Sequence, residues 1–174
     1  MELVRVWDPL LRLCHWGLAL ALLAAWLTRR GGGLWHEWLG YAALAIFALR
    51  LAWGWLGPRE ARFAQFVPSP ARTWAYLRLL ASGRAPRCLG HNPLGAWMTV
   101  ALLSTVALVA GSGWLYTTER FWGVAWVEAA HGALTDVLTG LVALHVAGVT
   151  FTSWHQRENL VAAMLHGRKR APSE

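Results

Sequence analysis

Two histidines, His131 and His145, lie fourteen positions apart in the last long apolar segment of the chain. On an α-helix this spacing is about four whole turns, so both imidazoles project from one face, about 21 Å apart along the axis. The hydrocarbon core of a bilayer is about 30 Å thick, so the rings are expected near opposite sides of a membrane. Imidazole is a common metal ligand. The spacing therefore predicts two ligand positions at two depths.

Two more histidines supply a second ligand, one at each of the two positions. His15 lies near the start of the first apolar segment, and His36 opens the second. Successive segments cross in opposite directions, so His36 is expected level with His131, and His15 level with His145. Two imidazoles that face each other across a helical bundle suit the two axial positions of a haem iron. Two such haems at two depths would form an electron path across a membrane.

Arg50 lies fourteen positions after His36, on the same helix face and at the depth of the His15–His145 pair. A charge inside a membrane span is costly and normally has a partner. A haem propionate is a natural one, because guanidinium binds carboxylate through two parallel hydrogen bonds. Alternatively, Arg50 extends to the cytoplasmic interface.

A zinc site is the competing interpretation of clustered histidines. Tetrahedral zinc needs three or four ligands at one point, whereas these histidines occur as separated pairs. Neither Cys14 nor Cys88 belongs to a Cys-x-x-Cys-His sequence, so covalently attached haem is not expected. Asp136, inside the last segment, is open to two interpretations, a proton relay or a hydrogen bond to a threonine such as Thr139.

The composition places these histidines in a membrane. The chain is 56% apolar and 14% charged, with thirteen tryptophans, whereas an average soluble domain is about 25% charged. Tryptophan is enriched at membrane interfaces. Four segments reach the length of about 20 residues that a crossing helix needs, and they are roughly 9–28, 34–56, 93–117 and 127–154. We therefore expect an all-α integral membrane four-helix bundle, formed by one domain over residues 1–174.

The basic residues indicate the orientation of the bundle. Four crossings put both termini and the long loop after the second segment on one side, and most arginines lie there. Only Arg29, Arg30 and Arg120 lie on the other side. Positive residues remain in the cytoplasm, so both termini are expected to be cytoplasmic. The net charge of +7 is thus a topology signal, and no nucleic-acid partner is expected.

Other signals concern shorter segments. Ser69-Pro70 predicts the start of a helix in the long loop and Gly83 its end, and the mixture of apolar and basic residues between them predicts a helix on the membrane surface. Residues 158–166 predict another short helix, followed by a basic tail. The third apolar segment is uniform until Gly111-Ser112-Gly113. A short polar turn, residues 29–33, separates the first two segments.

Motifs spread over nearly the whole chain are characteristic as a set. They are Val6-Trp7-Asp8-Pro9 with Arg12, His15 and Trp16; His36-Glu37-Trp38-Leu39-Gly40-Tyr41; Arg50-Leu51, Trp53-Gly54 and Gly57-Pro58-Arg59 with Ala61-Arg62-Phe63; Leu89-Gly90-His91-Asn92-Pro93; and Arg157-Glu158-Asn159-Leu160 with Gly167-Arg168-Lys169-Arg170. Together they resemble the bacterial di-haem cytochrome b561, or nickel-hydrogenase-type cytochrome b, family. In this chain His131 is followed by Gly132, where a glutamate is common in the family, and the loops opposite the termini are very short.

The resemblance implies two non-covalent b haems in a multi-pass protein of the bacterial inner membrane. It places His15, His36, His131 and His145 at the ligand positions. It further implies that electrons pass, in either direction, between ubiquinone or menaquinone and a periplasmic redox partner such as a c-type cytochrome. The chain would then be the electron-transfer subunit of a quinone-linked oxidoreductase, without catalytic residues of its own. The alternatives are a stand-alone superoxide:quinone oxidoreductase and a haem-free membrane anchor subunit.

Overall fold

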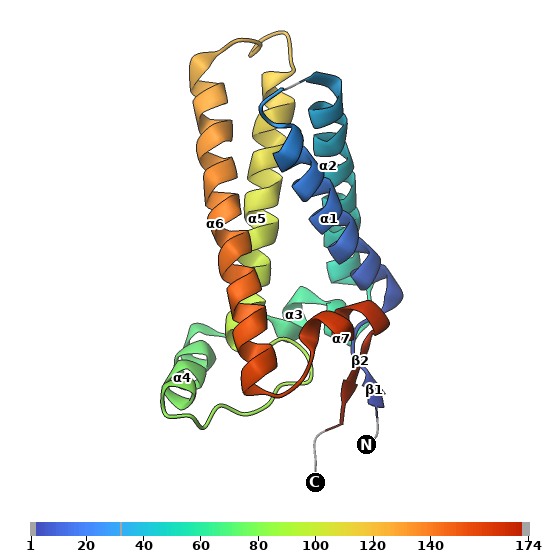
Figure 1. Ribbon diagram of the computed structural model, residues 1–174, viewed down its shortest axis with the longest axis vertical. Helices are drawn as coiled ribbons and strands as arrows, with labels where there is room; N and C mark the ends of the chain where they lie inside the picture. The colour runs from blue at the N-terminus through green and yellow to red at the C-terminus, as the bar shows by residue number, and fades with distance from the viewer. Residues whose placement is uncertain (1–2, 32, 172–174) are drawn as a thin grey trace. The chain divides into compact units, whose positions relative to one another are not determined.

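The computed structural model describes residues 3–31 and 33–171. Gly32, in the predicted turn, and residues 1, 2 and 172–174, at the ends of the predicted domain, lie outside this range. Figure 1 labels the helices and strands; the elements in chain order are β1 (Leu3–Arg5), α1 (Pro9–Thr28), α2 (Gly33–Leu56), η1 (Arg59–Ala61), α3 (Phe63–Phe66), α4 (Pro70–Ala81), α5 (Pro93–Tyr116), α6 (Ala125–His155), α7 (Leu160–His166) and β2 (Arg168–Arg170).

Four of these helices, α1, α2, α5 and α6, are long and apolar enough to cross a membrane. Their bounds agree with the predicted segments to within two residues; the largest difference is at α6, which begins at Ala125 instead of residue 127. Runs of leucine, alanine and valine with few charges leave the backbone no favourable alternative to a helix inside lipid. The predicted all-α fold with four spanning helices is confirmed for the described residues.

The start of α1 follows directly from its sequence. The Asp8 carboxylate accepts hydrogen bonds from the backbone N–H groups of Leu10 and Leu11, both at 3.0 Å, and Pro9 occupies the first helical position. An aspartate before a proline is a favourable helix cap. The same carboxylate oxygen accepts a hydrogen bond from Trp53 Nε1 at 3.0 Å, so the cap also fixes the end of α2.

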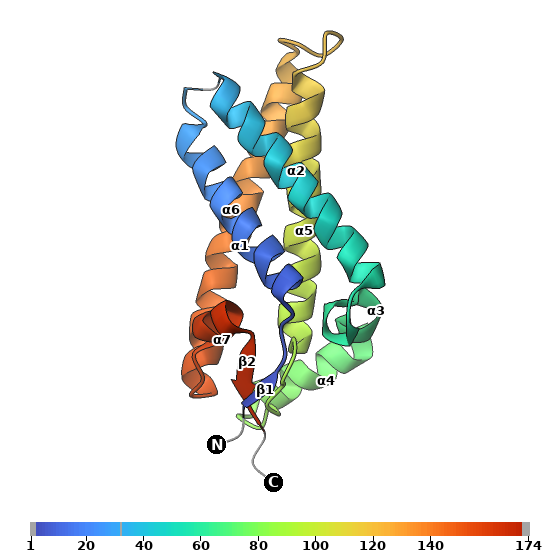
Figure 2. The same cartoon turned by 90° about the vertical axis from the view of Figure 1, so that its right-hand side faces the viewer.

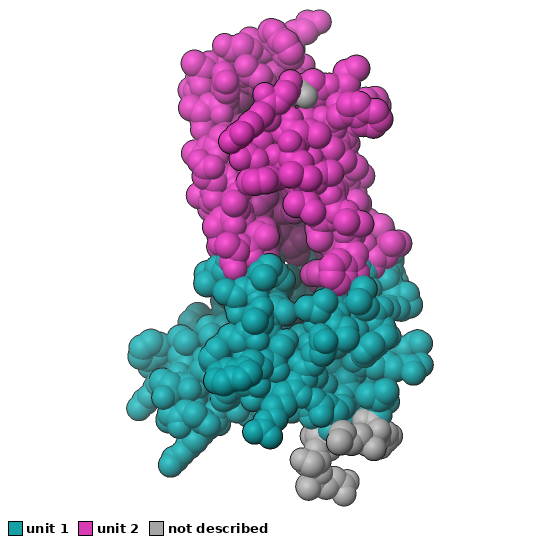
Figure 3. All heavy atoms as spheres, in the orientation of Figure 1, with its two compact units in different colours: residues 1–12, 52–100, 144–174 teal, residues 13–51, 101–143 magenta. Residues whose placement is uncertain are grey.

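The packing divides the chain into two compact units, which Figure 3 colours separately. Unit 1 contains residues 1–12, 52–100 and 144–174, and unit 2 contains residues 13–51 and 101–143. In unit 2, parts of all four long helices pack around one core, formed by Leu18, Ala21, Ala43, Val106 and Leu138. Small residues in such a core let helix backbones approach closely. Unit 2 is therefore a four-helix bundle.

In unit 1 a two-stranded sheet joins the two ends of the chain. β1 pairs antiparallel with β2, with Val4 opposite Lys169, and the two strands lie side by side next to α7 in Figure 2. The basic tail predicted from the sequence therefore begins as a strand. α7 ends at His166 and is followed by Gly167, whose φ of +80° suits glycine. The Gly167 carbonyl accepts hydrogen bonds from the N–H groups of Val6 and Trp7.

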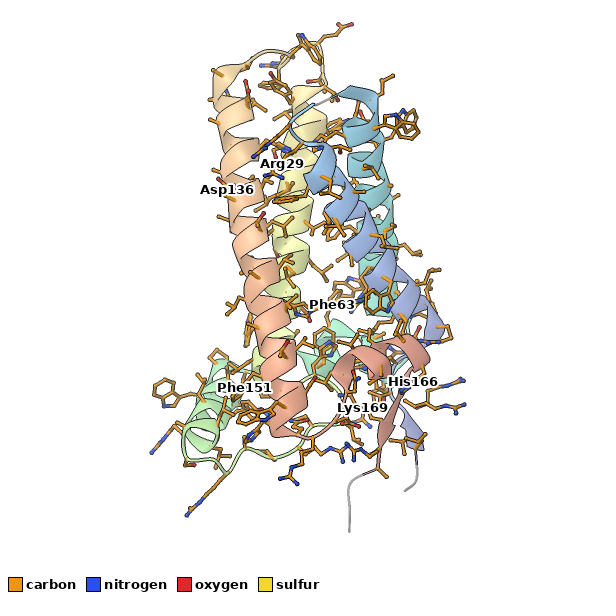
Figure 4. The ribbon with its side chains drawn as sticks, in the orientation of Figure 1. Arg29, Phe63, Asp136, Phe151, His166 and Lys169 are labelled. Carbon is orange, nitrogen blue, oxygen red and sulfur yellow. The ribbon has the colours of Figure 1, made fainter. Side chains whose placement is uncertain are left out.

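An ion network centred on the buried carboxylate of Glu158 accompanies this sheet. The Glu158 carboxylate accepts hydrogen bonds from Arg87 Nη2 at 2.8 Å and from the Arg170 N–H at 2.9 Å. Burial alone would raise the pKa of Glu158, but these bonds and the nearby positive charges outweigh it and lower that pKa. Lys169, labelled in Figure 4, lies 5.4 Å from the centre of the Trp7 ring. Burial lowers the pKa of Lys169. The network joins β2 to Glu158 and to the loop that contains Arg87.

The long loop contains a helix where the sequence predicts one. α4 begins after Ser69, whose hydroxyl accepts a hydrogen bond from the Arg72 N–H at 3.4 Å, as the sequence predicts. The second short helix, α7, begins after Asn159 and is likewise confirmed. The sequence did not predict η1 and α3, which lie between α2 and α4.

Candidate functional site

His36 lies in the first turn of α2, and its ring is held by the end of α1. His36 Nδ1 lies 2.9 Å from the carbonyl oxygen of Ala25. That carbonyl is one of the last four of α1, which receive no backbone hydrogen bond from their own helix, and it also accepts from the Thr28 hydroxyl at 3.1 Å. A carbonyl can only accept, so Nδ1 carries the proton and donates it. Nε2 then keeps its lone pair, the form of imidazole that binds a metal.

His131 lies in the second turn of α6, and its ring is held by α5. Its Nδ1 lies 3.1 Å from the carbonyl oxygen of Val109 and 3.1 Å from Ser112 Oγ. The Ser112 hydroxyl donates its own proton to the same Val109 carbonyl, at 3.0 Å. The Val109 carbonyl oxygen and the Ser112 oxygen therefore both act as acceptors toward His131, so His131 Nδ1 is also the protonated nitrogen. The Nε2 lone pair of His131 is thus available as well.

The structure brings these two rings together within unit 2. Their centres are 6.2 Å apart and their planes are at 89°. A bond from a transition metal to an imidazole nitrogen is about 2.0–2.1 Å, so two such bonds in line, with about 1 Å from each nitrogen to its ring centre, separate the centres by about 6 Å. The spacing of His36 and His131 therefore fits one metal ion between them. The two rings are half-buried.

The donor set at this point is a pair of imidazoles. Within residues 3–31 and 33–171, the structure contains no group of three or more His, Cys, Asp or Glu side chains arranged to hold a metal ion. A pair is too few for a structural zinc ion. It is sufficient for an iron that a porphyrin already holds through four nitrogens, and the residues therefore fit a haem.

The remaining predicted site residues are described within their own units. His15 belongs to unit 2 and is half-buried, with its ring centre 5.0 Å from the Trp16 ring and nearly perpendicular to it. His145 is half-buried in the part of α6 that belongs to unit 1. Their pairing stays a prediction. Arg50 in unit 2 is only 6% exposed, so its guanidinium lies in the protein interior, as a role beside a propionate would require.

Asp136, labelled in Figure 4, is exposed on α6. The predicted bond to Thr139 is not among the hydrogen bonds of the described residues, because the Thr139 hydroxyl donates to the Thr135 carbonyl instead, at 2.8 Å. Neither of the two interpretations of Asp136 is supported by a contact.

Unit 1 contains a cavity of about 480 Å³. It is lined by α3, α4 and the loop before α5, including Phe66, Tyr76 and His91. The His91 ring stacks on Phe66, with centres 4.4 Å apart. Burial raises the pKa of Tyr76, so its phenol keeps its proton and can donate a hydrogen bond. The lining of the cavity thus includes a stacked aromatic pair and a neutral hydroxyl donor, together with the charged side chains of Arg59, Glu60 and Arg72.

Three residues of the two sites described above were not predicted from the sequence: Ser112, Tyr76 and Phe66. Ser112 had a visible signal, because Gly111-Ser112-Gly113 interrupts an otherwise uniform apolar segment. Tyr76 and Phe66 gave no signal of their own, because their place beside the cavity depends on how α3 and α4 fold against the loop before α5.

The chain was compared with known families and proteins. A family model described as prokaryotic cytochrome b561 matches residues 6–167. The chain matches no curated protein and no solved structure at a significant level.

Proposed function

The chain belongs to the prokaryotic cytochrome b561 family, and we propose that it moves single electrons across the bacterial inner membrane between quinone and a periplasmic redox partner. The observation that carries the proposal is the pair His36 and His131, whose ring centres are 6.2 Å apart. Haem b, when bound, supplies a one-electron iron couple. Membership of this family implies binding of haem b.

Four histidines and one arginine would hold two haems. His36 and His131 would ligate one iron through Nε2, while their Nδ1–H groups remain bonded to helix carbonyls. Such bonds fix the ring orientation and raise the basicity of the ligand. His15 and His145 would ligate the second iron. The buried guanidinium of Arg50 would neutralise a propionate at that second site.

The orientation of the helices decides which haem faces which compartment. The excess of arginine in the termini and in the loop between α2 and α5 supports a cytoplasmic location for these segments. The His36–His131 pair would then lie near the periplasm, where the redox partner binds, and the His15–His145 pair near the cytoplasm.

The cavity of unit 1 is our candidate for the quinone head group. A quinone ring is flat and carries two carbonyl acceptors, so it suits an aromatic wall with a nearby donor. The Phe66–His91 stack offers the wall and the Tyr76 hydroxyl a donor. This cavity belongs to the same unit as His145, which supports electron exchange on the cytoplasmic side.

One feature favours a second candidate function, superoxide oxidation coupled to quinone reduction. The connection between α1 and α2 has only four residues, 29–32, and that between α5 and α6 only eight, 117–124. These short connections leave little surface on which a protein partner could bind, whereas a small anion such as superoxide needs no such surface. Mixing the purified protein with superoxide in a stopped-flow spectrometer should reduce the haem rapidly if this candidate is right, and slowly if a protein partner is required.

The main test measures haem content and electron transfer together. Purified protein should contain two haems per chain by the pyridine haemochrome assay, and a redox titration should show two one-electron steps. In proteoliposomes, quinol inside the bilayer should reduce an acceptor protein outside. A colourless protein would contradict the proposal and would favour the haem-free anchor subunit.

A further inference from the structure

We propose that Ser112 and Gly113 of α5 are positioning residues for the His131 ligand. Gly113 leaves the space into which the imidazole packs, and the Ser112 hydroxyl accepts a second hydrogen bond from its protonated Nδ1. This inference rests on the proposed function, because it assigns the second layer of contacts around a haem ligand.

The first observation concerns space. A Cβ atom placed on Gly113 would lie 3.0 Å from His131 Cε1 and 3.4 Å from Nδ1. Any larger residue would therefore push the ring by a few tenths of an ångström. A ring that moves away from α5 would lengthen the hydrogen bonds of its Nδ1 to Val109 and Ser112 of the same helix. A well-packed interior transmits such a displacement instead of absorbing it.

The second observation concerns protons. Serine inside a helix often bonds back to a carbonyl of its own helix, and Ser112 does so with Val109. That bond uses the hydroxyl proton, so the serine oxygen can only accept from His131 Nδ1. In the alternative tautomer an unprotonated Nδ1 would face the Val109 carbonyl, which can only accept, and the Ser112 hydroxyl would have to give up its bond to Val109 in order to donate to Nδ1. Ser112 thus helps to keep Nε2 unprotonated.

The neighbouring glycine supplies a matched control. Gly111 lies two residues from Gly113 in α5, and a Cβ atom placed on it would meet no atom within 4 Å. Gly111→Ala and Gly113→Ala make the same chemical change in the same helix, and differ in the contact with His131. Ser112→Thr keeps the hydroxyl and serves as the conservative control for Ser112→Ala.

The experiment measures haem content and midpoint potentials of the four purified variants. Gly113→Ala should lower haem content from two towards one per chain, or displace one of the two potentials, whereas Gly111→Ala should change neither. Ser112→Ala should keep both haems but raise one potential, because a ligand with a weaker hydrogen bond at Nδ1 is less basic and stabilises oxidised iron less. Ser112→Thr should restore the original potential.

The outcomes separate this inference from the proposed function. If the wild-type protein holds two haems and Gly113→Ala and Ser112→Ala leave both potentials unchanged, the positioning role is wrong and the proposed function stands. If the wild-type protein holds no haem, both are wrong. Should Gly113→Ala fail to fold, the potentials of Ser112→Ala and Ser112→Thr decide alone; identical potentials in these two variants would refute the role of the hydroxyl.

Discussion

The centres of the imidazole rings of His36 and His131 lie 6.2 Å apart, and the two ring planes are nearly perpendicular to each other. Each ring belongs to one helix and is bonded to another: His36 of α2 to Ala25 of α1, and His131 of α6 to Val109 of α5. One pair of side chains therefore connects all four long helices of unit 2. A metal bound between the rings would hold the bundle together, and loss of the metal would loosen it.

The first prediction separates the two proposed haems. His131→Ala should remove the haem at the His36–His131 pair, because one axial ligand is lost, and His145→Ala should remove the other. Each variant should retain one haem with one redox transition, and the two remaining potentials should differ. His166→Ala serves as the control, since His166 lies on α7, outside the long helices. Two intact haems in either ligand variant would refute the assignment of the pairs.

The second prediction concerns the cavity of unit 1. Tyr76→Phe removes a hydroxyl donor and leaves the ring, so quinol-dependent reduction of the haems should slow by up to about tenfold, the effect of one hydrogen bond of about 0.5–1.5 kcal/mol. Haem content and potentials should stay unchanged. Tyr116→Phe, which changes the same group in unit 2, should leave the rate unaltered. Equal rates in the wild type and Tyr76→Phe would exclude Tyr76 from the quinone site.

The third prediction concerns the glycine that ends α7. Gly167 and Gly83 both have positive φ, +80° and +70°, so alanine at either position should cost about 1–2 kcal/mol in backbone strain. A Cβ atom at Gly167 would also lie 2.6 Å from the Trp7 carbonyl oxygen, whereas one at Gly83 would meet nothing within 4 Å. Gly167→Ala should therefore cost about 1–3 kcal/mol more, the usual effect of overpacking.

Thermal unfolding midpoints of the two glycine variants, measured under the same detergent conditions, provide the comparison. The midpoint of Gly83→Ala should fall slightly and that of Gly167→Ala clearly further. Equal midpoints would show that the sheet formed by β1 and β2 can separate from α7 without loss of stability.

The fourth prediction concerns acid sensitivity. The folded-state pKa of Glu158 is lowered, chiefly because the bonds from Arg87 and Arg170 outweigh the effect of burial. A lowered carboxyl pKa contributes stability that is present above the unfolded value of about 4.3 and is lost as the pH falls through the folded value. Glu158→Gln should therefore lower stability at pH 7 by about 1–3 kcal/mol, and its further loss on acidification should be smaller than in the wild type.

The measurement for Glu158 is the unfolding midpoint at pH 7 and at pH 4. Glu119→Gln changes an exposed carboxylate and should reproduce the wild-type values at both. If Glu158→Gln unfolds like the wild type at pH 7, the ion pair with Arg87 contributes nothing measurable to the stability of the protein.

The sequence by itself determined the four spanning helices, the start of α4 after Ser69 and the shared depth of His36 and His131. These depend on local properties: the length of an apolar run, the hydrogen bonds open to one side chain, and the fixed rise and rotation of an α-helix. The same regularity placed His131 and His145 on one face of α6. Short elements such as β1 and β2 lacked such a signal, because each is stable only through its partner.

Only the tertiary structure decided which atoms surround the ligands. The contact of His131 with Ser112 and Val109 depends on the rotation of α5 and on its axial offset from α6, and no periodicity within either helix encodes those two quantities. The same holds for the approach of Gly113 to the His131 ring, and for the carbonyl of Ala25 that receives His36. Side chains choose among several rotamers and neighbours until the core is packed, so the second layer of the site is a property of the packed bundle.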